Sequence, residues 1–235
     1  MIFLIKAAVF DLDHTLFDRY ATIREIVKIM DADSCPFRTD IPRDTIADIY
    51  EYCDRAFVHF GWDRMYDEFS ARGVLKDGID KADFFKLHIH PLYMLAAVPF
   101  SFTVSTLERV KDMGLKLGLI TNGNHNLQYR KLDLLGIRDM FDEIIVSGDF
   151  GADKPDVRIF EEMARRMNLC PNEMLYIGDN PENDIEPSRT VGYTPIWIKT
   201  TGSWVFPQIE KPEFTADTVA EIPKIIEKLR ERDKQ

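Results

Sequence analysis

With 235 residues, of which 45% are hydrophobic, the chain suits one large domain or a domain that carries an insertion. Its net charge of −10 argues against nucleic acid as the main partner, because binding a phosphate backbone needs a basic surface. No run approaches the roughly 18 apolar residues of a membrane helix, and three scattered cysteines predict neither a metal site nor a disulfide framework. We therefore expect a cytoplasmic monomer or homodimer that acts on neither membranes nor nucleic acids.

The chain begins with an apolar stretch over residues 2–10, which predicts a short strand buried on both faces of a parallel sheet. Asp11 and Asp13 follow directly. Because buried carboxylates are costly, we expect them at the C-terminal end of the strand, where open α/β sheets bind ligands. Side chains at i and i+2 of an extended chain point the same way, so this pair suits a nucleophile with an acid/base, or a site for a hard cation.

Residues 18–99 show helical periodicity and no convincing strand pattern. A loop that carries two prolines is expected at 31–43. The predicted helices cover approximately residues 20–31, 44–60, 62–72 and 80–95. We interpret this segment as a helical insertion docked over the C-terminal edge of a sheet.

From residue 116 onward, strand patterns alternate with helix patterns. The predicted strands are residues 116–120, 143–146, 174–177 and 194–198. The predicted helices are residues 126–135, 156–167, about 183–191 and 221–232. Gly136 is expected to end the first of these helices, and Pro187 to sit in the first turn of the third or to kink it.

Such alternation predicts βαβ units, hence a parallel sheet with helices on both faces. The expected fold class is α/β, with a Rossmann-like core built from residues 1–17 and 100–235. An all-helical domain, residues 18–99, is inserted into that core.

Polar residues follow the core strands where those strands end. Thr121 and Asn122 follow the second strand, and Lys154 lies in the loop after the third. Asp179 follows the fourth strand, and Asp184 lies five residues further on. Because the carboxyl ends of parallel strands meet at one crevice, these side chains are expected to converge there with the aspartates of the first strand. Carboxylates, a hydroxyl, an amide and a lysine match the needs of phosphoryl transfer.

Four segments, taken in order, resemble the motifs of the haloacid dehalogenase-like (HAD) superfamily. They read DLDHT at 11–15, TNG at 121–123, KP at 154–155 and GDNPEND at 178–184. The helical insertion between the first two resembles the mobile cap of that family, and the resemblance spans nearly the whole chain. One departure is His14, where many relatives carry glycine.

The resemblance implies a role for each matching residue. Asp11 would attack phosphorus to form an aspartyl-phosphate, and Asp13 would protonate the leaving group and then activate water. The cofactor would be Mg²⁺, held by Asp11, Asp179 and the carbonyl of Asp13, and steadied by Asp184 through water.

Binding of the phosphoryl oxygens is assigned to a second set of residues. By the same resemblance Thr121, the backbone of Asn122 and Lys154 would bind them, and Lys154 would also offset the negative charge of the crevice. Two further residues are left open. Glu182 is an alternative to Asp184 as the second acid, and His125 could line the crevice.

The implied activity is Mg²⁺-dependent hydrolysis of a small phosphorylated metabolite. The motifs are most similar to pyrimidine 5′-nucleotidase-like and phosphoglycolate phosphatase-like members, so a nucleoside 5′-monophosphate is the first substrate expected. Alternatives are a phosphoglycolate phosphatase, a pyrophosphatase or a β-phosphoglucomutase-like phosphotransferase. A haloacid dehalogenase is disfavoured because such enzymes lack an acid at the place of Asp13. A catalytically inactive binding module is disfavoured because every motif residue is present.

Overall fold

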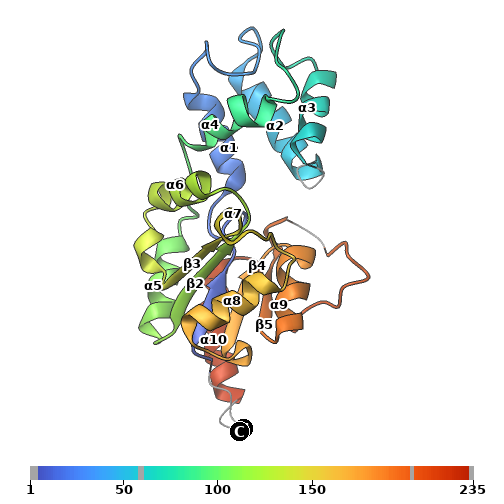
Figure 1. Ribbon diagram of the computed structural model, residues 1–235. Coiled ribbons are helices and arrows are strands. Elements are labelled where there is room, and N and C mark those ends of the chain that lie inside the picture. The colour runs from blue at the N-terminus through green and yellow to red at the C-terminus, as the bar shows by residue number, and fades with distance from the viewer. Residues whose placement is uncertain (1–4, 58–60, 202–203, 233–235) are drawn as a thin grey trace. The chain divides into compact units, whose positions relative to one another are not determined.

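The computed structural model describes residues 5–57, 61–201 and 204–232 (Figure 1). The chain divides into two compact units, one formed by residues 1–18 with 99–235 and the other by residues 19–98. The first unit is α/β and the second is helical. Since the two ranges of the α/β unit flank the helical unit in sequence, the helical unit is an insertion.

One parallel sheet of six strands forms the centre of the α/β unit. The strands are β1 (Ala7–Phe10), β2 (Lys116–Thr121), β3 (Glu143–Val146), β4 (Met174–Gly178), β5 (Thr194–Ile198) and β6 (Phe214–Ala216). Their order is β3-β2-β1-β4-β5-β6, and every pair is parallel. The connection after β1 leads to β2 on one side of the sheet, whereas the connection after β4 leads to β5 on the other side. The carboxyl ends of the neighbouring strands β1 and β4 therefore form a topological switch point. Ligands bind at such points in open α/β sheets.

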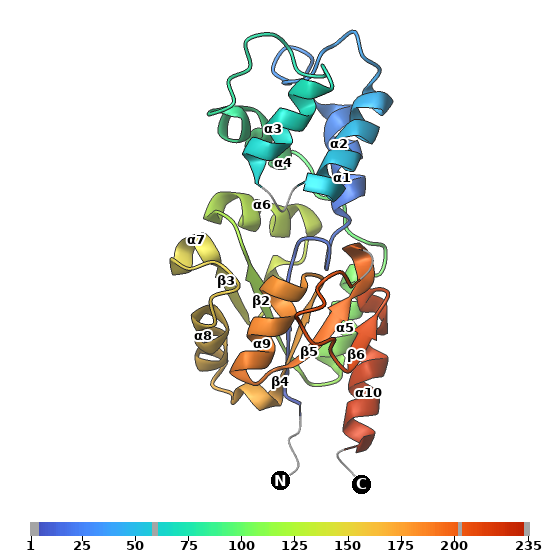
Figure 2. The same ribbon diagram turned by 90° about the vertical axis from the view of Figure 1, so that its right-hand side faces the viewer.

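Helices cover both faces of the sheet (Figures 1 and 2). They are α5 (Thr103–Asp112), α6 (His125–Leu135), α7 (Ser147–Phe150), α8 (Arg158–Met167), α9 (Glu186–Val191) and α10 (Ile222–Arg232). Helices α5 and α10 pack together on one side, and α8 and α9 on the other. The apolar residues of α8 recur at helical spacing, so Phe160, Met163 and Met167 all enter one buried cluster with Val9 and Tyr176 of the sheet.

The predicted fold class is confirmed, and most predicted elements are found with small shifts of their ends. The strands at 143–146 and 194–198 have the predicted bounds. Gly136 caps α6 in the left-handed conformation, with φ of 67°. Pro187 lies in the first turn of α9, and residues 181–185 before it form a π-helical turn in place of the expected α-helical start.

Other expectations were wrong or incomplete. Within the described residues the first strand is shorter than the predicted stretch 2–10, since it runs from Ala7 to Phe10, and residues 2–4 lie outside the described residues. Helix α5 and strand β6 were not predicted. With only three residues, β6 carries too few positions to show a period of two.

The inserted unit contains α1 (Arg19–Ile29), α2 (Arg43–Phe57), α3 (Trp62–Ala71) and α4 (His90–Tyr93). The helix predicted over 80–95 is found in part: a π-helix spans Phe84–Ile89 and is followed directly by the four residues of α4. Pro91 lies in the first turn of α4, and its ring would clash with the carbonyl of Leu87 if one α-helix continued through it. Residues 58–60 of the second predicted helix lie outside the described residues.

The inserted unit has a core of its own. The rings of Phe37, Tyr50 and Phe69 pack with centroids 5.2–5.8 Å apart. The buried carboxylate of Asp54 on α2 accepts hydrogen bonds from the guanidinium of Arg19 on α1, with Nη2 2.8 Å from Oδ1. These contacts fix the helices of the unit against each other.

Candidate active site

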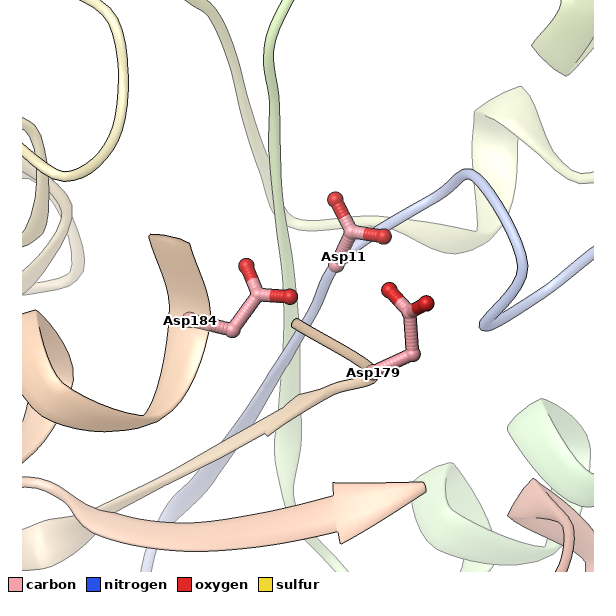
Figure 3. A group of neighbouring side chains, drawn as sticks. All are labelled: Asp11, Asp179 and Asp184. Atoms are coloured by element: carbon pink, nitrogen blue, oxygen red, sulfur yellow. The ribbon is translucent and has the colours of Figure 1, made fainter. Parts of the chain in front are cut away.

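Three carboxylates converge at the switch point of the sheet. Asp11 follows β1, Asp179 follows β4, and Asp184 lies in the π-helical turn after β4. All three are buried, and each offers an oxygen within 4.8 Å of oxygens of the other two. Figure 3 shows the carboxylates directed toward one another from three separate backbone segments. The sequence predicted this convergence, because these aspartates follow strand ends and the carboxyl ends of parallel strands meet at one edge of a sheet.

A glycine makes the close approach of Asp184 possible. A Cβ atom built on Gly178 would lie 2.5 Å from the carboxylate carbon of Asp184, which leaves no room for a side chain. The turn itself is held by Asn180, whose Oδ1 accepts hydrogen bonds from the backbone N–H groups of Glu182 and Asn183 at 2.9 and 3.0 Å. The N–H of Asn180 in turn donates to Asp184 Oδ2 at 3.0 Å. The hydrogen bonds of its own turn therefore fix the position of Asp184.

Lys154 contacts two of the three carboxylates. Its Nζ lies 2.6 Å from Asp11 Oδ1 and 2.7 Å from Asp184 Oδ1, and it donates to the hydroxyl of Tyr176 at 3.1 Å. Burial opposes a charge on this lysine, but Asp11 and Asp184 outweigh that effect and hold the pKa of Lys154 well above its ordinary value. Tyr176, on β4, was not predicted as a site residue. It lies within the apolar run 174–177, where nothing marks its hydroxyl as functional.

The charged form of the Asp11 carboxylate is destabilised by its surroundings. Its burial, opposed by the charge of Lys154 and reinforced by that of Asp184, raises the pKa of Asp11 to about 7. The pocket thus holds more negative charge than one lysine compensates. A cation with a preference for oxygen ligands would relieve that excess, and the three carboxylate oxygens are the donor set that Mg²⁺ favours.

The side chain of Asn122 holds the backbone of Lys154. Its Nδ2 donates to the carbonyl of Lys154 at 2.9 Å, and its Oδ1 accepts from the N–H of Lys154 at 2.8 Å. The sequence indicated only a phosphate-binding role for the backbone of Asn122, which remains a prediction. The amide side chain has a second use, because it fixes the loop that presents the lysine.

The loop after β2 is braced by the segment after β3. The N–H of Gly123 donates to Ser147 Oγ at 3.0 Å, and the N–H of Gly148 donates to the carbonyl of Gly123 at 3.0 Å. A Cβ atom on Gly148 would lie 2.7 Å from that carbonyl oxygen, so glycine is required for this contact. Thr121, at the end of β2, is buried next to this loop.

Asp13 is not one of the three converging carboxylates, and its side chain is bound by residues of α6. Both of its carboxylate oxygens lie 2.9 Å from Lys131 Nζ, and Gln128 Nε2 donates to Oδ2 at 3.2 Å. Lys131 and Gln128 were missed by the sequence reasoning. A signal was present, since both polar residues fall on the face of the helix that carries its buried leucines, three residues apart.

Three remaining expectations concern single residues. The backbone of His14 is left-handed, with φ of 62°, a conformation that favours glycine. Asp184 is buried within the group whereas Glu182 is exposed, so the structure favours Asp184 as the second acid. His125 is exposed, and its Nδ1 lies 2.7 Å from Asp149 Oδ2.

Comparison with known proteins identifies a family and several relatives. A family model described as haloacid dehalogenase-like hydrolase matches residues 5–192. A glyceraldehyde 3-phosphate phosphatase of Methanocaldococcus jannaschii is 35% identical over 56% of this chain and 58% of its own. A glyceraldehyde 3-phosphate phosphatase of Pyrococcus furiosus is 28% identical over 96% of this chain and 93% of its own.

Solved structures agree in fold. The magnesium-bound HAD-hydrolase YfnB of Bacillus subtilis superimposes with a TM-score of 0.73 at 21% identity, over 95% of this chain and 99% of that one. Three of the relatives described as glyceraldehyde 3-phosphate phosphatases align over only 43–58% of their own length, so their substrate is not carried over to this chain.

In the described residues, no helix combines the length and apolar character needed to cross a membrane.

Proposed function

Because this chain belongs to the haloacid dehalogenase-like hydrolase family, we propose that it is a Mg²⁺-dependent phosphatase of small phosphomonoesters. The observation that carries the proposal is the placement of Asp11. Its buried carboxylate lies at the switch point of the sheet, 2.6 Å from Lys154 and within the group formed with Asp179 and Asp184. A carboxylate in such a place suits nucleophilic attack on phosphorus.

In the proposed reaction, Asp11 forms a bond to phosphorus as the bond between phosphorus and the ester oxygen breaks. Asp13 gives a proton to the departing oxygen, and then takes a proton from the water that hydrolyses the aspartyl-phosphate. Lys154 and the loop at Thr121 and Asn122 bind phosphoryl oxygens and stabilise the charge on them. When bound by Asp11, Asp179 and Asp184, with the Asp13 carbonyl, Mg²⁺ would supply further positive charge to the same oxygens.

The substrate class is a small phosphorylated metabolite. Relatives described as glyceraldehyde 3-phosphate phosphatases support a short phosphate ester as the first candidate. A nucleoside 5′-monophosphate, which the motifs favour by resemblance, is the second candidate, and phosphoglycolate, sugar phosphates and pyrophosphate complete a panel. Transfer of the phosphoryl group to a second sugar hydroxyl, as in a mutase, would release little inorganic phosphate and is distinguished by that measurement.

The first test is phosphate release from p-nitrophenyl phosphate by the full chain, with Mg²⁺ and with EDTA. Turnover is expected with Mg²⁺ only, and Asp11→Asn should abolish it. Asp112→Asn is a matched control, because Asp112 is exposed at the end of α5. An absence of turnover from this ester and from the whole panel would overturn the proposed function.

A further inference from the structure

The carboxylate of Asp13, the proposed acid/base, contacts two side chains of α6 that have no part in the proposed mechanism. Lys131 Nζ lies 2.9 Å from each carboxylate oxygen, a symmetric arrangement that fixes the plane of the carboxylate as well as its position. The side chain of Lys131 is only 5% exposed, whereas that of Asp13 is 24% exposed. The lysine is therefore the buried partner, and the carboxylate keeps an open side for other contacts.

Stability alone does not account for a lysine at this place. Lys131 belongs to the buried face of α6, together with Leu127, Leu132 and Leu135. Its ammonium also lies 5.2 Å from the centre of the Phe17 ring. Burying an ammonium costs several kcal/mol, and replacing a buried ion pair by apolar residues is often neutral or stabilising. Apolar side chains in place of both Lys131 and Asp13 would therefore suit the fold about as well as the ion pair.

Gln128 connects Asp13 to the phosphate-binding loop. The Nε2 of this single amide contacts Asp13 Oδ2 at 3.2 Å, the carbonyl of Asn122 at 3.0 Å and the hydroxyl of Thr121. Gln128 and Lys131 are three residues apart on α6, so their side chains lie side by side on one face of the helix. The distance between the acid/base and the loop is thus set by a helix and does not depend on a flexible segment.

From this geometry we infer that Lys131 and Gln128 are positioning residues that orient the carboxylate of Asp13 for proton transfer to the leaving oxygen. The inference rests on the proposed function. The need for orientation depends on the leaving group: an alkoxide departs only if it receives the proton of Asp13 as its bond to phosphorus breaks. A p-nitrophenolate departs without one. Misplacement of a catalytic group by about 1 Å can cost two orders of magnitude in rate.

The test compares leaving groups in Lys131→Met, which keeps an unbranched side chain one atom shorter and removes its charge and donors. The measured quantity is kcat/KM for p-nitrophenyl phosphate and for the alkyl phosphate that the wild-type protein hydrolyses best. We expect a loss of about 100-fold for the alkyl ester, in the range of general acid catalysis, and a loss at least tenfold smaller for the nitrophenyl ester. Lys131→Arg, which retains a cationic donor, should recover part of the alkyl activity.

Controls separate positioning from folding. Arg130→Met removes one charge from the exposed side of the same helix and should leave both rates unchanged. Gln128→Met is the second variant should Lys131→Met fail to fold, and it should show the same selective loss at smaller size. In a protein that already carries Asp13→Asn, Lys131→Met should cause no further loss of kcat/KM, because the carboxylate that Lys131 positions is then absent.

Equal losses for both esters in Lys131→Met and Gln128→Met would overturn the positioning role and leave a structural one. Wild-type rates for the alkyl ester in these variants would also overturn the positioning role. In either case wild-type turnover would leave the proposed phosphatase intact. A wild-type protein that hydrolyses no ester would overturn the proposed function, and the positioning role with it.

Discussion

At the scale of single residues, the candidate site is built from groups whose burial is unfavourable. Asp11 illustrates this best, because burial and the neighbouring Asp184 raise its pKa to about 7 although Lys154 lies against it. Below about pH 7 the neutral form of Asp11 is therefore favoured over the charged form. The same carboxylate is the proposed nucleophile, which requires it to be charged when substrate binds.

This cost predicts how Asp11→Asn changes stability. A pKa raised above the ordinary 3.8 contributes stability that is complete below about pH 4 and is lost as pH rises through about 7. The amide of the variant stays neutral at every pH. In EDTA, the Tm of Asp11→Asn relative to wild type should therefore be higher at pH 8 than at pH 5. The Asp112→Asn control should show no such change, and an equal difference at both pH values would contradict the shift.

A second prediction concerns Gly178, where a Cβ atom would meet the carboxylate of Asp184 at 2.5 Å. Gly178→Ala should displace that carboxylate and weaken Mg²⁺ binding about 10- to 100-fold, measured by calorimetry. Gly118→Ala is a matched control in β2. There the new Cβ would meet the terminal methyl of Met167 at 2.7 Å, a flexible group far along its side chain. This control should lower Tm and keep Mg²⁺ affinity; equal affinities in both variants would contradict the role given to Gly178.

At the scale of elements, α6 does more than cover the sheet, because it carries Gln128 and Lys131. Its start is fixed by Asn124, whose Oδ1 accepts a hydrogen bond from the N–H of Leu127 at 2.9 Å. Its end is fixed by Gly136 in the left-handed conformation. The two caps fix the ends of the helix that carries Gln128 and Lys131.

The N-cap gives a third prediction. Asn124→Ala removes the acceptor for an otherwise unpaired N–H and should cost about 1 kcal/mol of unfolding free energy. Asn124→Asp keeps an acceptor and should restore most of it. Denaturant unfolding of the three proteins measures the difference. A loss in Asn124→Asp equal to that in Asn124→Ala would contradict the role of an acceptor oxygen at this cap.

At the scale of the whole molecule, all proposed catalytic and metal-binding residues belong to the α/β unit. The inserted unit, residues 19–98, begins and ends beside a β-bridge between Phe17 and Pro99. The two ends of the insertion are thus neighbours in the α/β unit, and a short linker is long enough to join them. We assign discrimination among leaving groups to the inserted unit as a proposal.

The fourth prediction follows from that arrangement. A protein in which a short Gly/Ser linker replaces residues 19–98 should unfold cooperatively and keep Mg²⁺-dependent hydrolysis of p-nitrophenyl phosphate. It should discriminate poorly among the esters of the panel. Circular dichroism during melting and kcat/KM across the panel measure the two effects. Loss of cooperative unfolding would contradict the independence of the α/β unit, and unchanged selectivity would contradict the role of the insertion.

The positions of five strands along the chain, and the polar residues that follow most of them, could be read from the sequence because both depend on local patterns; the order of the strands within the sheet was not predicted. Asp11, Thr121 and Asp179 each follow an apolar run, and in a parallel sheet such positions meet at one edge. The division into two kinds of unit was also visible, as a change from alternating strand and helix patterns to helical patterns alone. The stretch predicted over 80–95 is helical only from Phe84 to Tyr93, and periodicity does not show the change from a π-helix to an α-helix before Pro91.

Only the tertiary structure decided which side chains touch across long separations. Lys131 and Asp13 are 118 residues apart, and their contact depends on how α6 packs beside the end of β1. The hydroxyl of Tyr176 likewise acquires its partners only when β4 lies next to β1. Strand β6 exists because Phe214 pairs with Ile196 of β5, a pairing that three residues cannot encode by themselves. Local patterns therefore determined the fold class and the candidate nucleophile, whereas packing determined the surroundings that set the charge and orientation of each acid.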